Sequence, residues 1–177
     1  MAAHRVPALV VFVVLVLSSW TLMRQGEERS VTAGFDLERF VEAQDARDGD
    51  VTVYERALGE LRAGRKRSHW MWFVFPQLAG LGSSYMAQTY AIASLDEAAA
   101  YLAHPILGPR LRECVAAVNA HQGKTAHEIM GSPDDLKLRS CLTLFAHATA
   151  DNAAFLEGIR KYYGGEFDPA SMRVLGR

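Results

Sequence analysis

Helix-starting and helix-ending signals follow one another closely from residue 35 onward, and no strand-like alternation of apolar and polar residues separates them. Ser94 with Glu97, and Thr125 with Glu128, form capping-box patterns, in which a hydroxyl and a carboxylate bind free amide groups of a first turn. Gly64 follows another helical pattern, at a position where a left-handed residue is expected. The sequence therefore predicts an all-α fold, a compact single-domain bundle of several helices.

Apolar stripes at helical spacing predict which side of each helix faces the core. We expect the two longest helices, over residues 107–121 and 134–147, to bury the stripes Leu111, Cys114, Val115 and Val118, and Leu138, Cys141, Leu142 and Phe145. Shorter helices are expected over residues 36–44, 51–63 and 152–163, and after Asp168 and Pro169. Asp36 would cap the first of these shorter helices.

An uncharged apolar run begins at Val6 and ends at Met23, and a helix of this length just reaches across a bilayer core of about 30 Å. No small-x-small cleavage site follows the run, which argues against a cleaved signal peptide. Two alternatives stay open for residues 1–34. In the first, this segment is a signal anchor that contacts the membrane. In the second, residues 1–30 lie upstream of a miscalled start, and Val31 is the first residue of a cytoplasmic protein. In both cases residues 35–177 form the helical domain.

The composition is that of an ordinary globular protein, with 177 residues, 50% hydrophobic, 22% charged and a net charge of -1. It excludes a disordered or collagen-like chain, and it offers no extended positive face, so we expect no nucleic-acid binding. Cys114 and Cys141 are the only cysteines, too few for a disulfide-stabilised scaffold. We expect two buried free thiols, with a bridge between them as the alternative for an exported protein.

Residues 64–82, GRKRSHWMWFVFPQLAGLG, combine a cationic cluster with an aromatic wall. Arg65, Lys66 and Arg67 could attract a phosphate or a carboxylate, although most such clusters are simply solvated. Residues 70–76 are apolar on every side, which predicts a buried helical turn or a central strand that Pro76 ends. Core packing explains most of this segment. The abrupt junction at His69 is also how a pocket for a planar anionic ligand would be assembled.

Three separated blocks carry a resemblance to a known family. They are GRKRSHWMWFVFPQLAGLG at residues 64–82, DDLKLRSCLTLF at 134–145 and YYGGEFD at 162–168. Together they resemble the bacterial family called domain of unknown function 1810, over a span from Phe35 to Leu175. The resemblance implies a compact, mostly helical single domain with no established activity. Because that family ordinarily starts near the position of Phe35, the hydrophobic extension of this chain is a departure from it.

The sequence does not contain the residue spacing that known cofactor-binding and metal-binding motifs require, so we expect no cofactor and no metal. The stretch Gly123-Lys124-Thr125 resembles the end of a phosphate-binding loop, but Val118 stands where the first glycine is required. Gly80-Leu81-Gly82 lacks the third glycine of a dinucleotide fingerprint, since Tyr85 takes that position. His121, His127 and Glu128 do not share one helix face, which argues against a metal site.

The remaining candidate is a constellation that joins two of the blocks. If Lys137 or Arg139 reaches back under the segment from His69 to Trp72, the blocks would form one site with an acid or base and an anion clamp. The candidate catalytic residues are His69, Asp135 and Lys137. The candidate ligand-binding residues are Arg65, Lys66, Arg67, Trp70, Trp72, Gln77, Arg139 and Ser140. Structurally, Asp134 with Lys137 could equally be a surface ion pair, and Arg139 a bridge between helices.

Two functions from different classes follow. In the first, the domain binds or processes a phosphate-bearing small molecule that resembles a nucleotide or ADP-ribose, with a tryptophan stacking on its planar ring. In the alternative, it is a non-catalytic protein-interaction domain, tethered at the membrane by residues 6–23, whose basic loop meets an acidic protein partner that the sequence does not identify. The sequence leaves open whether the protein is an enzyme.

Overall fold

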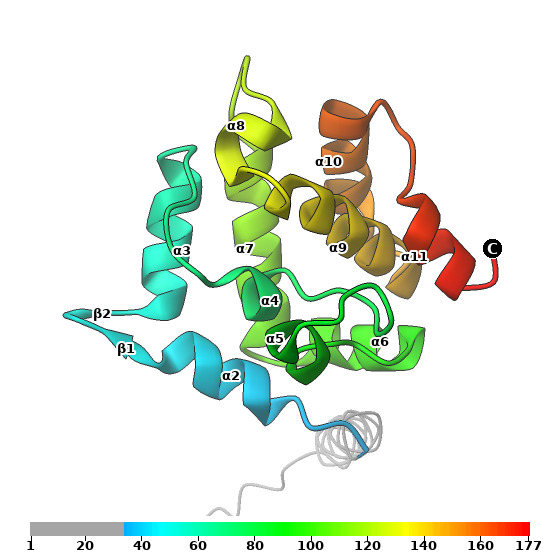
Figure 1. Cartoon of the computed structure of the whole chain (residues 1–177), viewed down its shortest axis with the longest axis horizontal. Helices are drawn as coiled ribbons and strands as arrows, with labels where there is room; N and C mark the ends of the chain where they lie inside the picture. The colour runs from blue at the N-terminus through cyan, green and yellow to red at the C-terminus, as the bar shows by residue number, and fades with distance from the viewer. Residues whose placement is uncertain (1–33) are drawn as a thin grey trace, which may run out of the picture. The chain divides into compact units, whose positions relative to one another are not determined.

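The computed structural model describes residues 34–177, so the apolar run from Val6 to Met23 and the alternative start at Val31 lie outside the described residues. The described residues form ten helices and one small sheet (Figure 1). In chain order these elements are α2 (Glu38–Asp45), β1 (Arg47–Asp48), β2 (Val51–Thr52), α3 (Val53–Arg62), α4 (Met71–Val74), α5 (Tyr85–Thr89), α6 (Leu95–Ala103), α7 (Leu107–Asn119), α8 (Ala126–Met130), α9 (Asp134–Ala148), α10 (Ala153–Tyr163) and α11 (Pro169–Val174).

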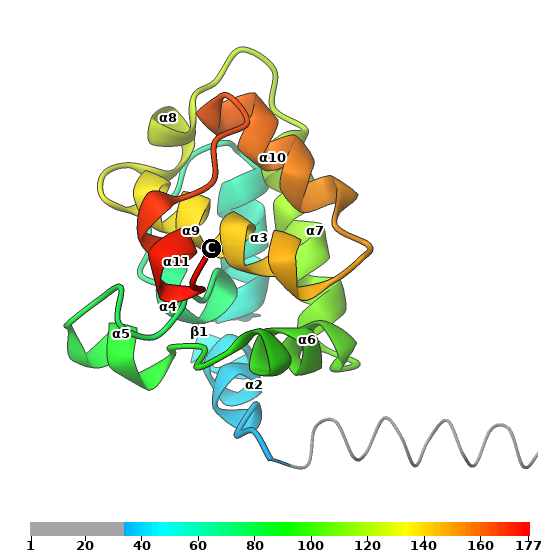
Figure 2. The same ribbon diagram turned by 90° about the vertical axis from the view of Figure 1, so that its right-hand side faces the viewer.

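Two helices, α7 and α9, form the centre of the domain. Helix α9 packs against α6, α8, α10 and α11, while α7 packs against α3, α4, α6 and α10. Both views place α9 between α10 on one side and α6 on the other (Figures 1 and 2). The predicted stripes of both helices are buried, from Leu111 to Val118 and from Leu138 to Phe145. These stripes face the core because each helix offers apolar side chains at i, i+3 and i+4.

Local capping signals set several helix ends, as the sequence predicts. Thr125 and Glu128 make a complete capping box at the start of α8. Ser94 accepts the amide N–H of Glu97, but the Glu97 carboxylate binds the N–H of Ala93 and the guanidinium of Arg39 instead of the capping residue's amide. The structure confirms the mostly helical fold. At the start of α6, only the Ser94 half of the predicted capping box is formed.

Two details of the first elements differ from the sequence prediction. Helix α2 begins after Leu37 and has no side-chain cap, so the prediction of Asp36 as its cap is wrong. The fold is also not purely helical, because β1 pairs with β2 in an antiparallel hairpin. Each strand has only two residues, too few to show an alternating pattern in the sequence.

The aromatic segment folds as a single helical turn, α4, that begins after Trp70. Trp70 is buried completely, and its Nε1–H donates to the Glu60 carboxylate over 2.9 Å. The same carboxylate accepts the amide N–H groups of Arg67 and Ser68, so it holds the basic loop and the aromatic block together. Trp72 is the exception in this segment, since it is only half-buried.

Cys114 and Cys141 are both buried and free, as the sequence predicts. Burial, together with the nearby Glu113 carboxylate, raises the pKa of the Cys114 thiol to about 12. Burial also raises the pKa of Cys141 well above its ordinary value. Between residues 34 and 177, every helix is too short or too polar to cross a membrane.

Candidate functional site

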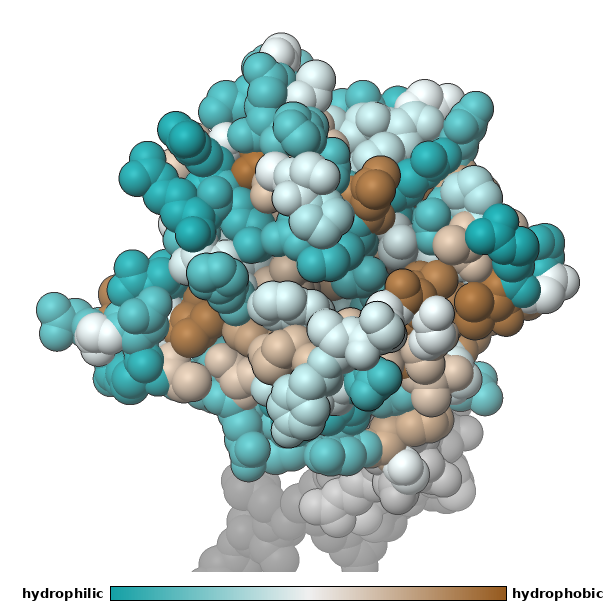
Figure 3. Space-filling view, viewed as in Figure 1, coloured by the Kyte–Doolittle hydropathy of each residue, from teal (hydrophilic) through white to brown (hydrophobic). Residues whose placement is uncertain are grey.

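A pocket of about 530 Å³ opens where the loop between α4 and α5 meets α9 and α11. Figure 3 views this face of the molecule, where apolar side chains interrupt a mostly hydrophilic surface, and Figure 2 shows α5 at the edge of the fold near α11. The polar and aromatic residues of its lining are Trp72, Gln77, Ser83, Ser84, Lys137, Ser140 and Asp168. Apolar side chains complete the wall, including Leu81, Pro133 and Leu136.

Lys137 and Trp72 form one wall of this pocket as a cation–π pair. The Lys137 ammonium lies 5.1 Å from the centre of the Trp72 ring, although the two residues come from different blocks of the sequence. Helix α9 begins after Pro133, so Lys137 lies near its start. The Lys137 side chain lines the pocket and keeps 26% of its surface exposed.

The carboxylate of Asp134 binds two lysines at once. Its Oδ1 accepts from Lys137 at 2.8 Å, and its Oδ2 pairs with Lys66 at 2.7 Å. Lys66 is nearly buried, with 9% of its side chain exposed, and lies 5.0 Å from the centre of the Trp70 ring. Burial raises the pKa of Asp134, but the hydrogen bonds from Lys137 and Lys66 outweigh burial and hold it below its ordinary value. Three charges therefore meet beside the pocket, and the positive ones are in excess.

Ser140 and Asp168 line the pocket as well. The Ser140 hydroxyl donates to Asp168 Oδ2 at 3.0 Å or to the Leu136 carbonyl at 3.2 Å. Asp168 also caps α11, where its Oδ2 accepts the amide N–H and the hydroxyl of Ser171. Burial raises the pKa of Asp168, but its bonds from Ser171 and Ser140 outweigh burial and keep the pKa below its ordinary value. Asp168 is therefore an ionised carboxylate in the pocket wall.

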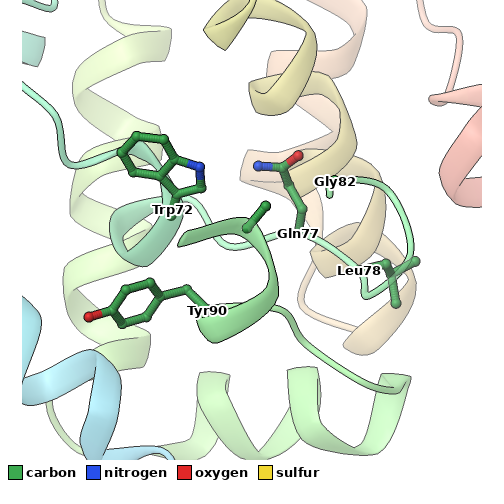
Figure 4. A pocket seen from close by; sticks show the side chains of 6 residues that line it. Trp72, Gln77, Leu78, Gly82 and Tyr90 are labelled. Carbon is green, nitrogen blue, oxygen red and sulfur yellow. The ribbon is translucent and has the colours of Figure 1, made fainter. Parts of the chain in front are cut away.

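Gln77 reaches the pocket from a loop that is held by main-chain pairing. The amide N–H of Ile92 donates to the Gln77 carbonyl at 2.8 Å, and Leu78 pairs with Ile92 as a parallel bridge. A second, narrower cavity continues behind Gln77 and Trp72 toward Tyr90. In Figure 4 the polar ends of Trp72 and Gln77 point toward each other across this cavity. Both residues therefore contribute to two neighbouring hollows.

Of the residues that the sequence singled out, the pocket brings together Trp72, Gln77, Lys137 and Ser140. Lys66 does not line the pocket, and it is connected to Lys137 only through Asp134. Trp70 is fully buried and does not line the pocket either.

The other candidates lie outside the pocket. Arg65, Arg67 and His69 are exposed on the loop before α4. Arg139 binds Glu166 through the carbonyl at 3.1 Å and the carboxylate at 3.3 Å, so it bridges α9 to the segment before α11. Asp135 pairs with His127 at 3.0 Å and does not line the pocket.

Two acidic residues of the site were not among the sequence candidates. Asp134 was expected only as a surface partner of Lys137, and Asp168 only as the start of a helix. The i, i+3 pairing of Asp134 and Lys137 is indeed present, but Lys66 is a second partner that local sequence does not indicate. Within residues 34–177, three or more His, Cys, Asp or Glu side chains nowhere gather to hold a metal ion.

Comparison with known proteins identifies one family. The model of a family described as "Protein of unknown function (DUF1810)" matches residues 34–175. The chain is also similar to the conserved hypothetical protein Rv1873 from Mycobacterium tuberculosis, known from a crystal structure. The two are 56% identical, with a TM-score of 0.76, over 81% of this chain and 98% of that one. No curated protein matches the chain. From the fold, the three sequence blocks and the matched span, the chain belongs to the DUF1810 family.

Proposed function

We propose that the pocket between α9, α11 and the α4–α5 loop binds a small molecule that carries a planar ring and a phosphate or another anionic group, as a nucleotide-like or ADP-ribose-like compound does. The observation that carries this proposal is the Trp72–Lys137 pair, which places an ammonium and an aromatic ring together on one accessible wall. A pocket of this size can hold a nucleotide-sized ligand, and a few polar groups among apolar walls are the usual lining of such sites.

The charge arrangement around Asp134 supports the choice of an anionic ligand. Lys137 can turn to a ligand at little cost because Lys66 stays within 2.7 Å of the Asp134 carboxylate and keeps it neutralised. Without Lys66, a ligand that drew Lys137 away would leave a half-buried carboxylate unpaired, which costs several kcal/mol, on the order of 3 to 5. Lys66 is therefore a positioning residue in this proposal, and Lys137 is the group that meets the anion.

The ionised Asp168 limits the amount of negative charge that the pocket accepts. A phosphate close to Asp168 would be repelled, so we place it at the Lys137 end of the pocket, next to the first turn of α9. The planar ring then lies beside Trp72 and Gln77, where aromatic surface and an amide are exposed to it. His69, Arg65 and Arg67 take no part in this proposal, because they do not line the pocket.

Ligand-dependent thermal stability of the full chain tests this proposal. We expect a subset of nucleotides, ADP-ribose derivatives and sugar phosphates to raise the melting temperature, since a ligand at 100 times its Kd stabilises by about 2.7 kcal/mol. Lys137→Ala should abolish the shift, and Trp72→Ala should weaken it. Arg160→Ala is the matched control, because it removes an exposed cation of α10 outside the pocket lining. A shift that survives Lys137→Ala would place the ligand elsewhere, and no shift with any compound would refute the proposal.

A second function, capture of an acidic protein partner, is favoured by one separate observation. Arg65 and Arg67 are exposed, and neither side chain forms an ion pair with any residue in the described part of the chain. Exposed and unpaired guanidinium groups are suited to bidentate binding of carboxylates. The charge-reversal variant with Arg65→Glu and Arg67→Glu should lose partner capture while the ligand-induced thermal shift is unchanged. The proposed membrane tether depends on residues outside the described range.

A further inference from the structure

The two carboxylate oxygens of Asp168 are used very unequally. Oδ2 accepts three hydrogen bonds, from the Ser140 hydroxyl at 3.0 Å, the Ser171 amide at 2.9 Å and the Ser171 hydroxyl at 2.6 Å. Hydrogen bonding from the Ala170 backbone N–H also lowers the pKa of this carboxyl group. From residues 34–177, Oδ1 receives no hydrogen bond of ordinary geometry. A carboxylate group has about four acceptor positions in all, so Oδ1 has unused capacity on a residue that lines the pocket.

The cap of α11 does not explain this arrangement by itself. A capping carboxylate needs only one oxygen to bind the amide of the third helical residue, and Oδ2 already does so with Ser171. Thr143 additionally fixes the Asp168 main chain, since its hydroxyl accepts the Asp168 N–H at 2.9 Å. Three hydrogen bonds therefore hold the Asp168 side chain while it lines the pocket. Such a fixed, ionised acceptor is suited to bind hydroxyl groups of a ligand.

Ser140 stands next to this acceptor and has capacity of its own. Its single O–H donates a hydrogen bond to Asp168 or to the Leu136 carbonyl, so its lone pairs can accept a hydrogen bond from a ligand hydroxyl. Ser140 follows Lys137 by three residues, which places both on the same side of α9 about one turn apart. Anion-binding and hydroxyl-binding groups are thus presented in a row along one wall.

We infer that Asp168, with Ser140, recognises neighbouring hydroxyl groups of the ligand, so that the pocket selects a sugar phosphate with a planar base over ring-bearing anions without hydroxyls. This inference rests on the proposed function and names the substrate class within it. The phosphate binds at Lys137, and the hydroxyls of the sugar bind at Asp168 Oδ1 and Ser140. Asp168 then determines specificity in addition to capping α11.

Matched nucleotides and a conservative variant test the inference. Binding of adenosine 5′-monophosphate and of 2′,3′-dideoxyadenosine 5′-monophosphate to the full chain would be measured by calorimetry. The two probes share base and phosphate, and they differ in the two hydroxyls. Asp168→Asn keeps an amide oxygen for the α11 cap and replaces the Oδ1 acceptor with a donor. Asp96→Asn, at an exposed position of α6, is the matched control.

The expected result is a difference between probes that depends on Asp168. The unmodified protein and Asp96→Asn should bind the hydroxylated nucleotide about tenfold or more tightly than the dideoxy form, as expected for hydrogen bonds to a charged group. Asp168→Asn should lose that preference. Its affinity for the dideoxy form should stay within about twofold of that of the unmodified protein, because this probe has no hydroxyls for Asp168 to bind. Unchanged thermal unfolding would show that the variant is folded.

Two other outcomes separate this inference from the proposed function. Equal, Lys137-dependent binding of both nucleotides would overturn the role of Asp168 and leave the proposed anion site standing. A preference for the hydroxylated nucleotide that persists in Asp168→Asn would also overturn the role of Asp168 and leave the proposed anion site standing. If neither nucleotide binds, this inference fails, and the thermal-stability screen decides the proposed function separately. If binding does not depend on Lys137, the proposed function and this inference both fail.

Discussion

The buried indole of Trp70 donates its N–H to Glu60 over 2.9 Å, and this pair fixes the basic loop to the aromatic turn. The Glu60 carboxylate also accepts two main-chain amides and the Ser68 hydroxyl. One side chain thereby satisfies four donors. Its loss would leave the Trp70 N–H without a partner inside the core.

We expect Glu60→Ala to lower the free energy of unfolding by about 2 kcal/mol, because a buried donor without a partner costs about 1 to 3 kcal/mol. Chemical denaturation measures the change. Glu157→Ala, at an exposed position of α10, should change stability by less than about 0.5 kcal/mol. In a Trp70→Phe background the cost of Glu60→Ala should shrink. An equal cost in both backgrounds would show that the indole bond is not its source.

Acid should destabilise the domain through three partly buried carboxylates whose folded pKa values are lowered. Glu60 has an ordinary pKa of 4.5, and Asp134 and Asp168 have 3.8. In each, burial raises the pKa and hydrogen bonds outweigh burial, so the folded protein binds the proton less readily than the unfolded chain. Their stabilisation is complete above the ordinary pKa values and is lost as the pH falls through the lower folded values.

Denaturation curves between neutral pH and strongly acidic pH measure this loss. Asp134→Asn should flatten the acid limb of the stability profile, because one of the three carboxylates no longer titrates. It should also lower stability at neutral pH, since two partly buried lysines lose their common partner. An acid limb of unchanged slope in this variant would contradict the assignment.

Two helical glycines should respond in opposite directions to alanine. A Cβ at Gly108, near the start of α7, would lie 2.0 Å from the carbonyl oxygen of Leu102, a main-chain atom that cannot move aside. We expect Gly108→Ala to destabilise by about 3 kcal/mol or more. Gly59, inside α3, has no atom within 4 Å of its Cβ position, so Gly59→Ala should stabilise by about 0.5 to 1 kcal/mol. Thermal unfolding of both variants compares them directly.

The two thiols should be inert in the folded protein. Cys114 and Cys141 are fully buried, and burial keeps both protonated at neutral pH, with the pKa of Cys114 raised to about 12. Because the thiolate is the reactive form, a disulfide reagent at pH 8 should label neither cysteine before unfolding. In denaturant it should label both. Rapid labelling of one thiol under native conditions would show local opening of the α7–α9 core.

Local sequence determined most of the helical framework. Capping residues, terminal glycines and stripes act over three or four neighbouring positions, so Thr125 with Glu128 and the stripe from Leu138 to Phe145 could be interpreted without a structure. The family could also be identified from three short blocks, and the matched residues 34–175 confirm it. The hairpin of β1 and β2 could not be predicted, because strands of two residues are too short to show an alternating pattern in the sequence.

Only the tertiary structure decided which polar residues share a site. Trp70 and Trp72 look alike in the sequence, yet Glu60 fixes Trp70 in the core while Trp72 meets Lys137 at a pocket. Asp168 reaches that pocket from the C-terminal end of the chain. Contacts between such distant segments depend on how whole helices pack, and no pattern among neighbouring residues encodes them. The sequence by itself therefore determined the helices and the family, and helix packing decided the site.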